Sequence, residues 1–435
     1  MSEADHWDDI SIADLGEIVA GGTPSRSAPW FWNGSIPWVT PGEIKALNSR
    51  YVRDTREKIT SEGLAASAAK LLPVGSLLVT TRATLGEVAI AAVPVATNQG
   101  FKSIIPNERT DSLFAYYLLQ TLRPEMKRLS SGTTFLEISK SDFARIRTRR
   151  PEPEEQSRIA IVLDLVDQAI AKTEAVIAKL KQMRAGLVND LLTRGLDENG
   201  ELRDPLAHPE EFEGSRLGQI PTAWAVRPLT ELASFQNGKT FPSTQYCDTG
   251  VRLLRPGNLP SSEFVTWEPK DTICLPEKWV AFAPDYVVRG SELIMNLTAQ
   301  SLEEQFLGRV CMTQAGDFCL LNQRLARFRP LDCDLRFLFW SLRGPVFRRQ
   351  IDKNPQGTKV QHIYDRDLRA VHLPVPKDPA EQTKIVNILF GFANHIGAEQ
   401  CLAQKLDSIR LGLRADLVTG RVRVPESIFA SGSLA

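Results

Sequence analysis

Two segments of this chain match each other without a gap, and this match limits the fold more than any other feature. Residues 155–193 align with residues 381–419 after a shift of 226 positions (381 − 155). Glu155-Gln156 meets Glu381-Gln382, and the correspondence continues upstream with small gaps, as in Asn98-Gln99 and Asn322-Gln323. The chain therefore contains two copies of one unit, each a variable globular part followed by a well-matched segment.

Apolar residues recur in the matched segments at alternating steps of three and four, which is the a/d pattern of a coiled coil. Polar residues interrupt this seam at equivalent positions, Thr173 and Glu399, then Arg184 and Arg410. We expect the two helices to pair with each other antiparallel; two amphipathic helices in separate cores are the alternative. The predicted seam residues are Ile159, Leu163, Val166, Ile170, Ile177, Leu180, Leu187, Leu191, Ile385, Leu389, Phe392, Ile396, Leu406, Leu413 and Leu417.

The globular parts read as mixed helix and strand. In the first copy, residues 77–81, 87–91 and 101–105 predict short strands, and residues 112–127 predict a helix. The second copy repeats this order at 292–296, 308–313, 325–328 and 335–342. The predicted fold class is α+β, with two tandem domains joined by long helices that pair as an antiparallel coiled coil, a pseudo-twofold internal repeat.

The same comparison gives domain boundaries. The first globular domain covers residues 1–153 and its helix 154–195, and the second covers 222–379 with its helix at 380–422. Residues 196–221, rich in Asp, Glu, Gly and Pro, predict a linker. Residues 423–435 form a tail.

Composition excludes several classes of protein. The chain has 52 Lys and Arg against 52 Asp and Glu, and its apolar stretches are too short to span a membrane. The N-terminus is acidic, unlike a secretory signal, so a cytoplasmic protein is expected. The six cysteines all lie in the second half without a C-x-x-C pair, and the five histidines lack short ligand spacing, so we expect no metal site.

Enzyme motifs are incomplete. Gly238-Lys239-Thr240 resembles the end of a phosphate-binding loop, but Ala233 stands where the first glycine is needed. Glu43-Ile44-Lys45 resembles half of a nuclease site and lacks the preceding Pro-Asp. No methyltransferase tetrapeptide and no G-x-S-x-G motif occurs in the sequence. A chain without its own catalytic motifs is most simply explained as a binding protein.

A basic stretch occurs at the same place in both copies. Residues 123–150 contain eight basic and three acidic residues, and residues 343–369 contain seven and three. Such stretches are candidates for contacting the phosphates of a nucleic acid. A solvated helix-and-strand face explains the charge equally well.

Short motifs of a known family occur in a fixed order over nearly the full length of the chain. They are Leu15-Gly16-Glu17-Ile18, Gly21-Gly22-Thr23-Pro24, Ile36-Pro37-Trp38-Val39-Thr40-Pro41-Gly42-Glu43-Ile44, Arg82-Ala83-Thr84-Leu85-Gly86, Ala96-Thr97-Asn98-Gln99-Gly100-Phe101, Ser131-Gly132-Thr133-Thr134, Pro153-Glu154-Glu155-Gln156, Leu192-Thr193-Arg194-Gly195-Leu196 and Ile220-Pro221-Thr222-Ala223-Trp224. With these motifs the chain resembles the specificity (S) subunit of type I restriction-modification systems.

The resemblance implies a non-catalytic subunit with two target-recognition domains, each reading one half of a split double-stranded DNA sequence, held apart by the coiled coil. It further implies two modification (M) subunits that methylate adenine with S-adenosylmethionine, and restriction (R) subunits that cut after ATP-driven movement. S-adenosylmethionine, ATP and Mg are then expected on the partner subunits, with no cofactor on this chain. The partner would flip the base and carry out the chemistry.

The resemblance also divides the candidate DNA-contacting residues into two groups. Residues identical in both copies cannot by themselves distinguish two different half-sites, so they are expected to build the scaffold or touch phosphates: Asn98, Gln99, Gly132, Thr133, Asn322, Gln323, Gly357 and Thr358. Base readers are expected where the copies diverge: Arg26, Asn48, Arg50, Arg53, Arg82, Thr84, Lys239, Asn258, Asn296, Gln300 and Gln305. The aromatic cluster of Trp30, Phe31, Trp32 and Trp38 is expected in the core.

Two other functions remain open at this stage. One is a scaffold whose coiled coil joins partner proteins without reading DNA. The other is the targeting subunit of a related, type IIB-like system that cuts on both sides of its site. A scaffold would not bind DNA in a sequence-selective way, whereas a specificity subunit would. The identity of the partner chains distinguishes the type IIB-like system from a type I system.

Overall fold

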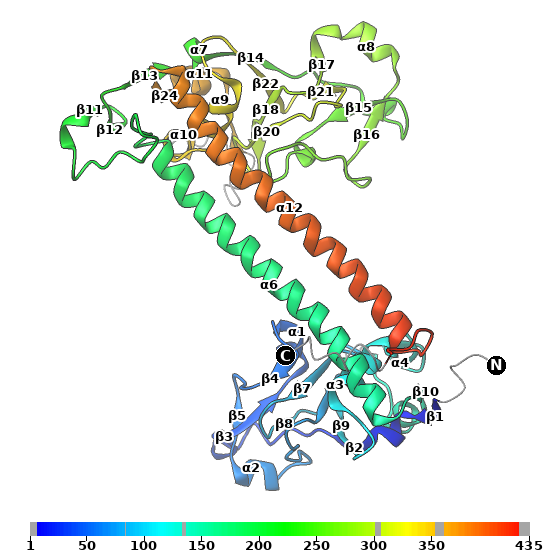
Figure 1. The fold of residues 1–435 in the computed structure, drawn as a ribbon. Helices are drawn as coiled ribbons and strands as arrows, with labels where there is room; N and C mark the ends of the chain where they lie inside the picture. The colour runs from blue at the N-terminus through cyan, green and yellow to red at the C-terminus, as the bar shows by residue number, and fades with distance from the viewer. Residues whose placement is uncertain (1–6, 83, 133–135, 301–305, 353–360, 426–435) are drawn as a thin grey trace. The chain divides into compact units, whose positions relative to one another are not determined.

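A computed structural model describes residues 7–82, 84–132, 136–300, 306–352 and 361–425 (Figure 1). The chain divides into two compact units, of which the first comprises residues 1–174 and 401–435 and the second comprises residues 175–400. Each unit therefore holds one globular domain, the end of one long helix and the beginning of the other. Unit 1 is assembled from the two extremes of the chain, whereas unit 2 is continuous.

Unit 1 is built on a five-stranded sheet with the order β2 (Gly16–Ala20), β9 (Lys102–Pro106), β6 (Leu77–Val79), β7 (Val88–Ala91) and β4 (Tyr51–Val52). A second sheet joins β5 (Lys58–Ile59), β3 (Trp32–Val39) and β8 (Ala96–Thr97). Strand β1 (Asp8–Ser11) pairs antiparallel with β10 (Arg147–Arg150), next to the start of the first long helix. The helices of the domain are α1 (Pro41–Ala46), α2 (Ser61–Ala65), α3 (Ser112–Thr121), α4 (Arg123–Arg128) and α5 (Lys140–Arg145).

Unit 2 is likewise built on two main sheets. Its first sheet has the order β14 (Ala233–Asn237), β22 (Leu325–Pro330), β18 (Leu293–Asn296) and β20 (Val310–Met312). The second is β16 (Ile273–Leu275), β15 (Val251–Leu254), β21 (Cys319–Leu321) and β17 (Val287–Val288). Smaller pairs are β13 (Trp224–Pro228) with β24 (His372–Pro376), and β19 (Thr298–Ala299) with β23 (Gln361–His362). Helices α7 (Leu229–Leu232), α8 (Lys278–Phe282), α9 (Leu335–Ser341), α10 (Pro345–Asp352) and α11 (Asp365–Ala370) complete it. The α+β prediction is confirmed in both units.

The predicted strands and helices fall close to their expected positions, with one difference. The single helix expected over residues 112–127 is two helices, α3 and α4, separated at Leu122. Pro124 stands at the second position of α4, where its missing N–H costs nothing, whereas inside a continuous helix its ring would clash with the preceding turn. The predicted linker also contains a hairpin, β11 (Phe212–Ser215) with β12 (Gly218–Pro221), that sequence reasoning did not foresee.

The matched segments form the long helices α6 (Pro153–Leu191) and α12 (Pro379–Leu417), of 39 residues each. Both begin with proline, whose fixed φ suits the first helical position, and both are followed by a glycine of positive φ, Gly195 (+67°) and Gly420 (+74°). All of the predicted seam residues are buried or half-buried. Among the described residues, no helix is long and apolar enough to cross a membrane.

Contacts within each unit show that the two helices pair antiparallel (Figure 1). In unit 1 the start of α6, at Leu163, and the end of α12, at Leu417, belong to one apolar cluster. In unit 2 the end of α6, at Leu191, and the start of α12, at Leu389, share another cluster. The predicted antiparallel pairing of α6 with α12 is therefore confirmed, and the seam is continuous with the core of each domain.

Buried ion pairs fix the first turn of each helix to the segment that follows the other helix. Glu381 is 7% exposed and accepts hydrogen bonds from Arg203 (2.7 and 3.2 Å), from the Trp224 indole (3.0 Å) and from the Leu196 backbone N–H (2.9 Å). The equivalent Glu155 accepts two hydrogen bonds from Arg423. The linker and the tail thus play the same part in the two units.

We predict that Glu381→Ala lowers the free energy of unfolding by about 3 kcal/mol, because the nearly buried Arg203 guanidinium loses its close counter-charge and keeps only the longer ion pair with Glu211 (3.9 Å). Urea unfolding of the full chain measures this effect. Glu213→Ala, an exposed position in the hairpin, is the control and should change stability by less than about 0.5 kcal/mol. Equal small losses in both variants would contradict the anchoring role of Glu381.

Candidate nucleic-acid interface

A glycine turn is built identically in the two domains. The N–H of Gly22 donates to the Thr97 carbonyl (2.8 Å), and that of Lys239 donates to the Leu321 carbonyl (3.0 Å). The preceding glycines, Gly21 and Gly238, approach the next chain segment so closely that a Cβ atom would lie 1.9 or 2.0 Å from a carbonyl oxygen. Only glycine fits at these two positions.

The repeated amides brace this turn. Gln99 accepts a hydrogen bond from the Thr23 hydroxyl, and Gln323 accepts one from Thr240. Asn98 accepts from the Gly100 N–H (2.8 Å), and Asn322 is buried. These contacts support the scaffold part of the expectation for these four residues. Gly132 is exposed, while Thr133, Gly357 and Thr358 lie outside the described residues.

Three predicted base readers occupy structural positions instead. Asn258 and Asn296 are both fully buried, and their side-chain amides are used by backbone groups: Asn258 accepts from the Arg255 N–H (2.9 Å) and donates to the Thr266 carbonyl (3.1 Å). Asn296 donates to the carbonyls of residues 298 and 306 (2.7 and 2.9 Å). Buried amides with satisfied hydrogen bonds cannot reach a base edge, so we assign both a structural role.

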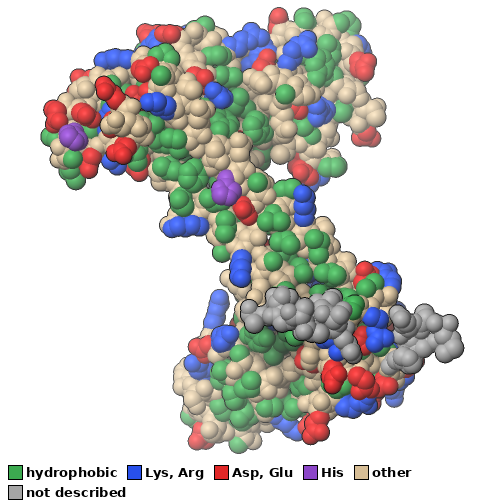
Figure 2. Space-filling view, in the orientation of Figure 1, with side chains coloured by type: hydrophobic (Ala, Val, Ile, Leu, Met, Phe, Trp, Pro, Cys, Tyr) green, Lys and Arg blue, Asp and Glu red, His purple; other side chains and the backbone are tan. Residues whose placement is uncertain are grey.

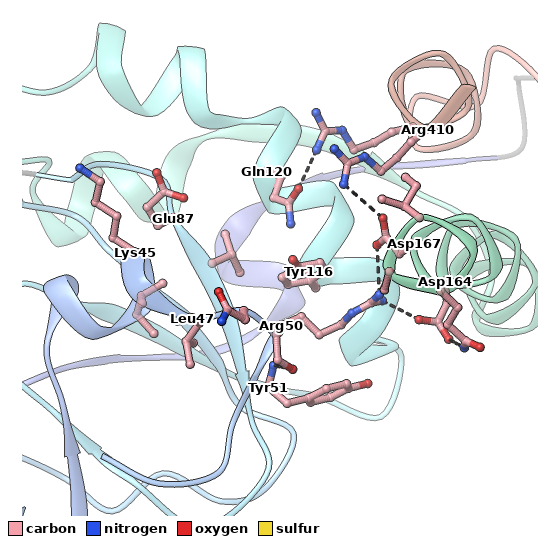
Figure 3. Close-up of a pocket in the computed structure, with 18 of the residues that line it drawn as sticks. Lys45, Leu47, Arg50, Tyr51, Glu87, Tyr116, Gln120, Asp164, Asp167 and Arg410 are labelled. Atoms are coloured by element: carbon pink, nitrogen blue, oxygen red, sulfur yellow. Dashed lines mark hydrogen bonds and ion pairs between the residues drawn. The ribbon is translucent and has the colours of Figure 1, made fainter. Parts of the chain in front are cut away.

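Arg50 is the third corrected assignment, and it lies in a groove of about 1010 Å³ in unit 1 (Figure 3). Its guanidinium, 12% exposed, pairs with Asp164 (2.8 Å) and Asp167 (3.0 Å) of α6 and donates to the Tyr117 hydroxyl (2.6 Å). Burial and the hydrogen bond to Asp167 raise the pKa of Tyr117, so its hydroxyl stays protonated. Arg50 therefore attaches the first domain to α6.

The groove of Figure 3 has a counterpart in unit 2 with a different charge. In unit 1 its lining includes five cationic and five carboxylate side chains. The equivalent groove of about 690 Å³ lies between α6, α9 and α10. Its charged lining is Lys181, Arg184, Arg343, Arg348, Arg349 and Asp352. The second groove is therefore strongly cationic, although Arg184 pairs with Glu263 and Arg348 with Asp352.

The remaining predicted readers lie on exposed or half-exposed loops. Asn48, Arg53 and Gln300 are exposed, and Lys239 is half-buried with its ammonium 5.7 Å from the centre of the Tyr286 ring. Gln305 lies outside the described residues. These positions are accessible to a ligand, but their roles as base readers stay predictions.

Arg82 and Thr84 lie on the loop between β6 and β7. The Arg82 side chain is 44% exposed and makes a long ion pair with Glu137 (3.7 Å). The Thr84 hydroxyl is buried and has no hydrogen-bond partner among the described residues. This loop therefore offers a long cationic side chain that a weak ion pair leaves able to reorient.

Arg26 is held by its neighbours. Its guanidinium lies 3.7 Å from the centre of the Trp32 ring and pairs with both carboxylate oxygens of Glu57. Trp38 is buried, as expected, and donates to the Gly22 carbonyl (3.0 Å), but Trp30 is 68% exposed, so the expectation of a core position was wrong for Trp30. The predicted aromatic cluster thus presents one ring to solvent.

Sequence reasoning missed an aromatic stack in unit 2. His362 and Tyr364 stack with ring centres 5.8 Å apart, and Arg366 lies over Tyr364 (5.3 Å). These side chains line a groove of about 930 Å³ together with Gln323 and Arg324. Ile138 and Ile363 make the same backbone hydrogen bond in the two copies, so Tyr364 stands where the first copy has Ser139. Because base readers were expected where the two copies diverge, the same comparison could have identified Tyr364.

A family model described as the type I restriction modification DNA specificity domain matches the chain twice, at residues 4–182 and 221–408. The chain belongs to this family. The predicted function, a non-catalytic DNA specificity subunit with two recognition domains, is confirmed by this match, and the scaffold without DNA reading is not favoured.

Relatives cover most of the chain. The chain is similar to the MjaIX specificity subunit of Methanocaldococcus jannaschii, with 26% identity over 97% of this chain and 94% of the relative. It also resembles the EcoR124I/EcoR124II specificity subunit of Escherichia coli, at 29% identity over 36% of this chain and 40% of that one. A crystal structure of the S subunit from M. genitalium has a similar fold, with a TM-score of 0.55 and 15% identity over 94% of this chain and 96% of the other.

We predict that Arg50→Ala destabilises unit 1 by about 2 kcal/mol, because Asp164 and Asp167 lose a shared, nearly buried partner. Thermal unfolding followed by intrinsic fluorescence measures the change. Arg53→Ala, three residues away on the exposed surface, is the matched control and should leave stability unchanged. An Arg50→Ala variant of normal stability that fails to bind one half-site would restore the base-reading role.

Proposed function

We propose that the chain selects a bipartite DNA target for a type I restriction-modification complex, with one domain reading each half. The observation that carries this proposal is the contrast between scaffold and loops. The glycine turn with its Thr–Gln hydrogen bond and the Glu–Arg helix anchor recur in both units. The exposed polar side chains nearby differ between the copies, as two different half-sites require.

In this proposal the accessible divergent residues contact base edges. Arg82 suits guanine, because a guanidinium can donate twice to O6 and N7, and exposed amides such as Asn48 and Gln300 suit adenine. Tyr364 and its stacked neighbours offer a flat surface at the second half-site. Arg50, Asn258 and Asn296 are not among these contacts.

The cationic groove of unit 2 supports a phosphate contact beside the bases. Lys181, Arg343 and Arg349 have no carboxylate partner among the described residues, and Arg343 donates to two backbone carbonyls (one at 3.0 Å). Burial lowers the pKa of Arg343, and the nearby charges of Arg184 and Arg309 also lower it while Glu263 raises it. A phosphate placed there would relieve the repulsion among these cations, independently of DNA sequence.

The long helices would set the gap between half-sites. Each has 39 residues, so each spans roughly 60 Å at 1.5 Å per residue. Because α6 starts in unit 1 and ends in unit 2, the length of α6 contributes to the distance between the two reading domains. A chain built this way accepts one spacing and rejects others, as dimeric DNA readers do.

Partner subunits have a candidate docking surface on the same helices. Val176 and Met183 of α6 are 43% and 44% exposed and lie seven residues apart, on one face. Leu402 and Ile409, the equivalent residues of α12, are exposed as well. Figure 2 shows apolar side chains on the visible face of the helical region. We propose that the helices of two methyltransferase subunits cover these stripes, one at each copy, and that restriction subunits join through them.

The catalytic groups would then reside on the partners. S-adenosylmethionine would bind the methyltransferase subunits, and ATP and Mg the restriction subunits. The chain described above would contribute target selection and assembly in the cytoplasm.

We predict that Arg82→Ala weakens binding to one half-site by about 1–3 kcal/mol and leaves the other half-site unaffected. Selection from DNA libraries with the complete methyltransferase complex measures this, and varying the gap in the same libraries tests the spacing role of the helices. Arg109→Ala, whose guanidinium pairs with Asp8 and Glu152 and which lies outside the basic stretch, is the control. Equal weakening on unrelated DNA, or tolerance of many gap lengths, would count against the proposal.

We predict that Val176→Glu combined with Met183→Glu lowers the number of methyltransferase subunits captured per chain from two to one, because the stripe of Leu402 and Ile409 on α12 stays intact while the α6 stripe loses two apolar side chains that each contribute about 1.5 kcal/mol or more when buried. The isolated chain should keep its unfolding temperature, because both side chains are exposed there. Leu206→Glu, at the most exposed leucine of the linker, controls for added charge. Unchanged capture would exclude this face as the docking surface.

A further inference from the structure

Two cysteines face each other at an edge of the second sheet of unit 2. Cys274 lies in the edge strand β16, and Cys247 lies in the loop before β15. Their backbones exchange two hydrogen bonds, from the Cys247 N–H to the Cys274 carbonyl and from the Cys274 N–H to the Cys247 carbonyl, each of 3.0 Å. They therefore form a directly opposed antiparallel pair.

This pairing brings the two thiols within reach of each other. Opposed residues of this kind have Cα atoms about 5.5 Å apart and project to the same face of the ladder. Disulfides need a Cα separation of roughly 4.4–6.8 Å and a Cβ separation near 3.8 Å. The Cα separation is already suitable, whereas the Cβ atoms, about 5 Å apart in such a pair, must close by about 1–1.5 Å and the Cys247 thiol must leave the Thr249 carbonyl. The loop can supply that closure, because residues 248–250 are exposed.

The two thiols differ in accessibility. Cys247 is half-exposed, whereas Cys274 is 7% exposed. Burial raises the pKa of Cys274, and the neighbouring Cys247 raises it further. Cys247 is thus the group that meets a reagent first, and Cys274 is sheltered behind it. The other four cysteines lie within the described residues, and none is opposed to a second cysteine in a strand pair.

We propose that Cys247 and Cys274 are a modification site at which a small-molecule disulfide, such as oxidised glutathione, closes a reversible intramolecular disulfide. The Cys247 thiolate attacks one sulfur of the reagent, whose S–S bond breaks and releases one glutathione thiolate. Cys274 then loses its proton to water and attacks the Cys247 sulfur, which releases the second glutathione. Two electrons and two protons pass from the chain to the reagent, so one disulfide is exchanged for another.

The bond would tie the loop of residues 246–250 covalently to β16. In a reducing compartment such a bond is transient and is reversed by thiols. The proposal concerns the thiols alone and stands apart from the proposed DNA-reading function.

The test treats the full chain with oxidised glutathione at neutral pH, followed by peptide mapping without reduction. We expect a peptide cross-linked between Cys247 and Cys274 that dithiothreitol releases. Exposed Cys401, which has no opposed cysteine, serves as an internal control and should carry only glutathione. A wild-type chain in which Cys247 also carries only glutathione would overturn the proposal.

Two variants make the result decisive. In Cys274→Ser, Cys247 should stop at the mixed disulfide with glutathione, because the resolving thiol is missing. If that buried substitution prevents folding, Cys247→Ser in the exposed loop replaces it and should leave Cys274 unmodified. Modification of Cys274 at the rate of Cys401 in the latter variant would contradict the sheltered geometry.

Discussion

The apolar seam of the two long helices is the constraint from which the rest of the structure follows. Its residues recur at steps of three and four in both copies, and at each end they merge with the core of a domain. Burial of these side chains contributes far more than the polar contacts around them, yet apolar contacts alone allow sliding. The Glu381–Arg203 and Glu155–Arg423 pairs remove that freedom, since a buried ion pair accepts only one register.

A shared scaffold with divergent loops separates two physical tasks. The glycine turns, the Thr–Gln hydrogen bonds and the helix anchors hold each domain in one conformation, and they are alike because both domains need the same rigidity. The accessible arginines, amides and aromatic rings are free to differ, since they stabilise little. Rigid support under variable side chains is what a reader of changing sequences needs.

The sequence was sufficient for the two long helices, for three strands of the first sheet in each domain and for the fold class, because repetition and periodicity are local properties of the chain. It was insufficient for Arg50, Asn258 and Asn296, since each was selected as a polar residue in a divergent loop. Arg50 is held by distant partners, Asp164 and Asp167, which are more than a hundred positions away. Asn258 and Asn296 bond to backbone groups within ten positions, in turns that periodicity does not reveal. The difference in charge between the two grooves also escaped prediction, because helices far apart in sequence contribute to each. Tyr364, by contrast, was within reach of the repeat alignment.

Unit 1 is formed by two segments that are far apart in the sequence, and this affects the order in which the two domains fold during translation. Leu417, Val418 and Val424 belong to the same apolar cluster as Leu15 and Phe114, so that core is incomplete until residue 424 has left the ribosome. Unit 2 is continuous and has all of its residues earlier. The usual order, in which the N-terminal domain matures first during translation, is therefore inverted here. The first domain to be synthesised is the last to be completed.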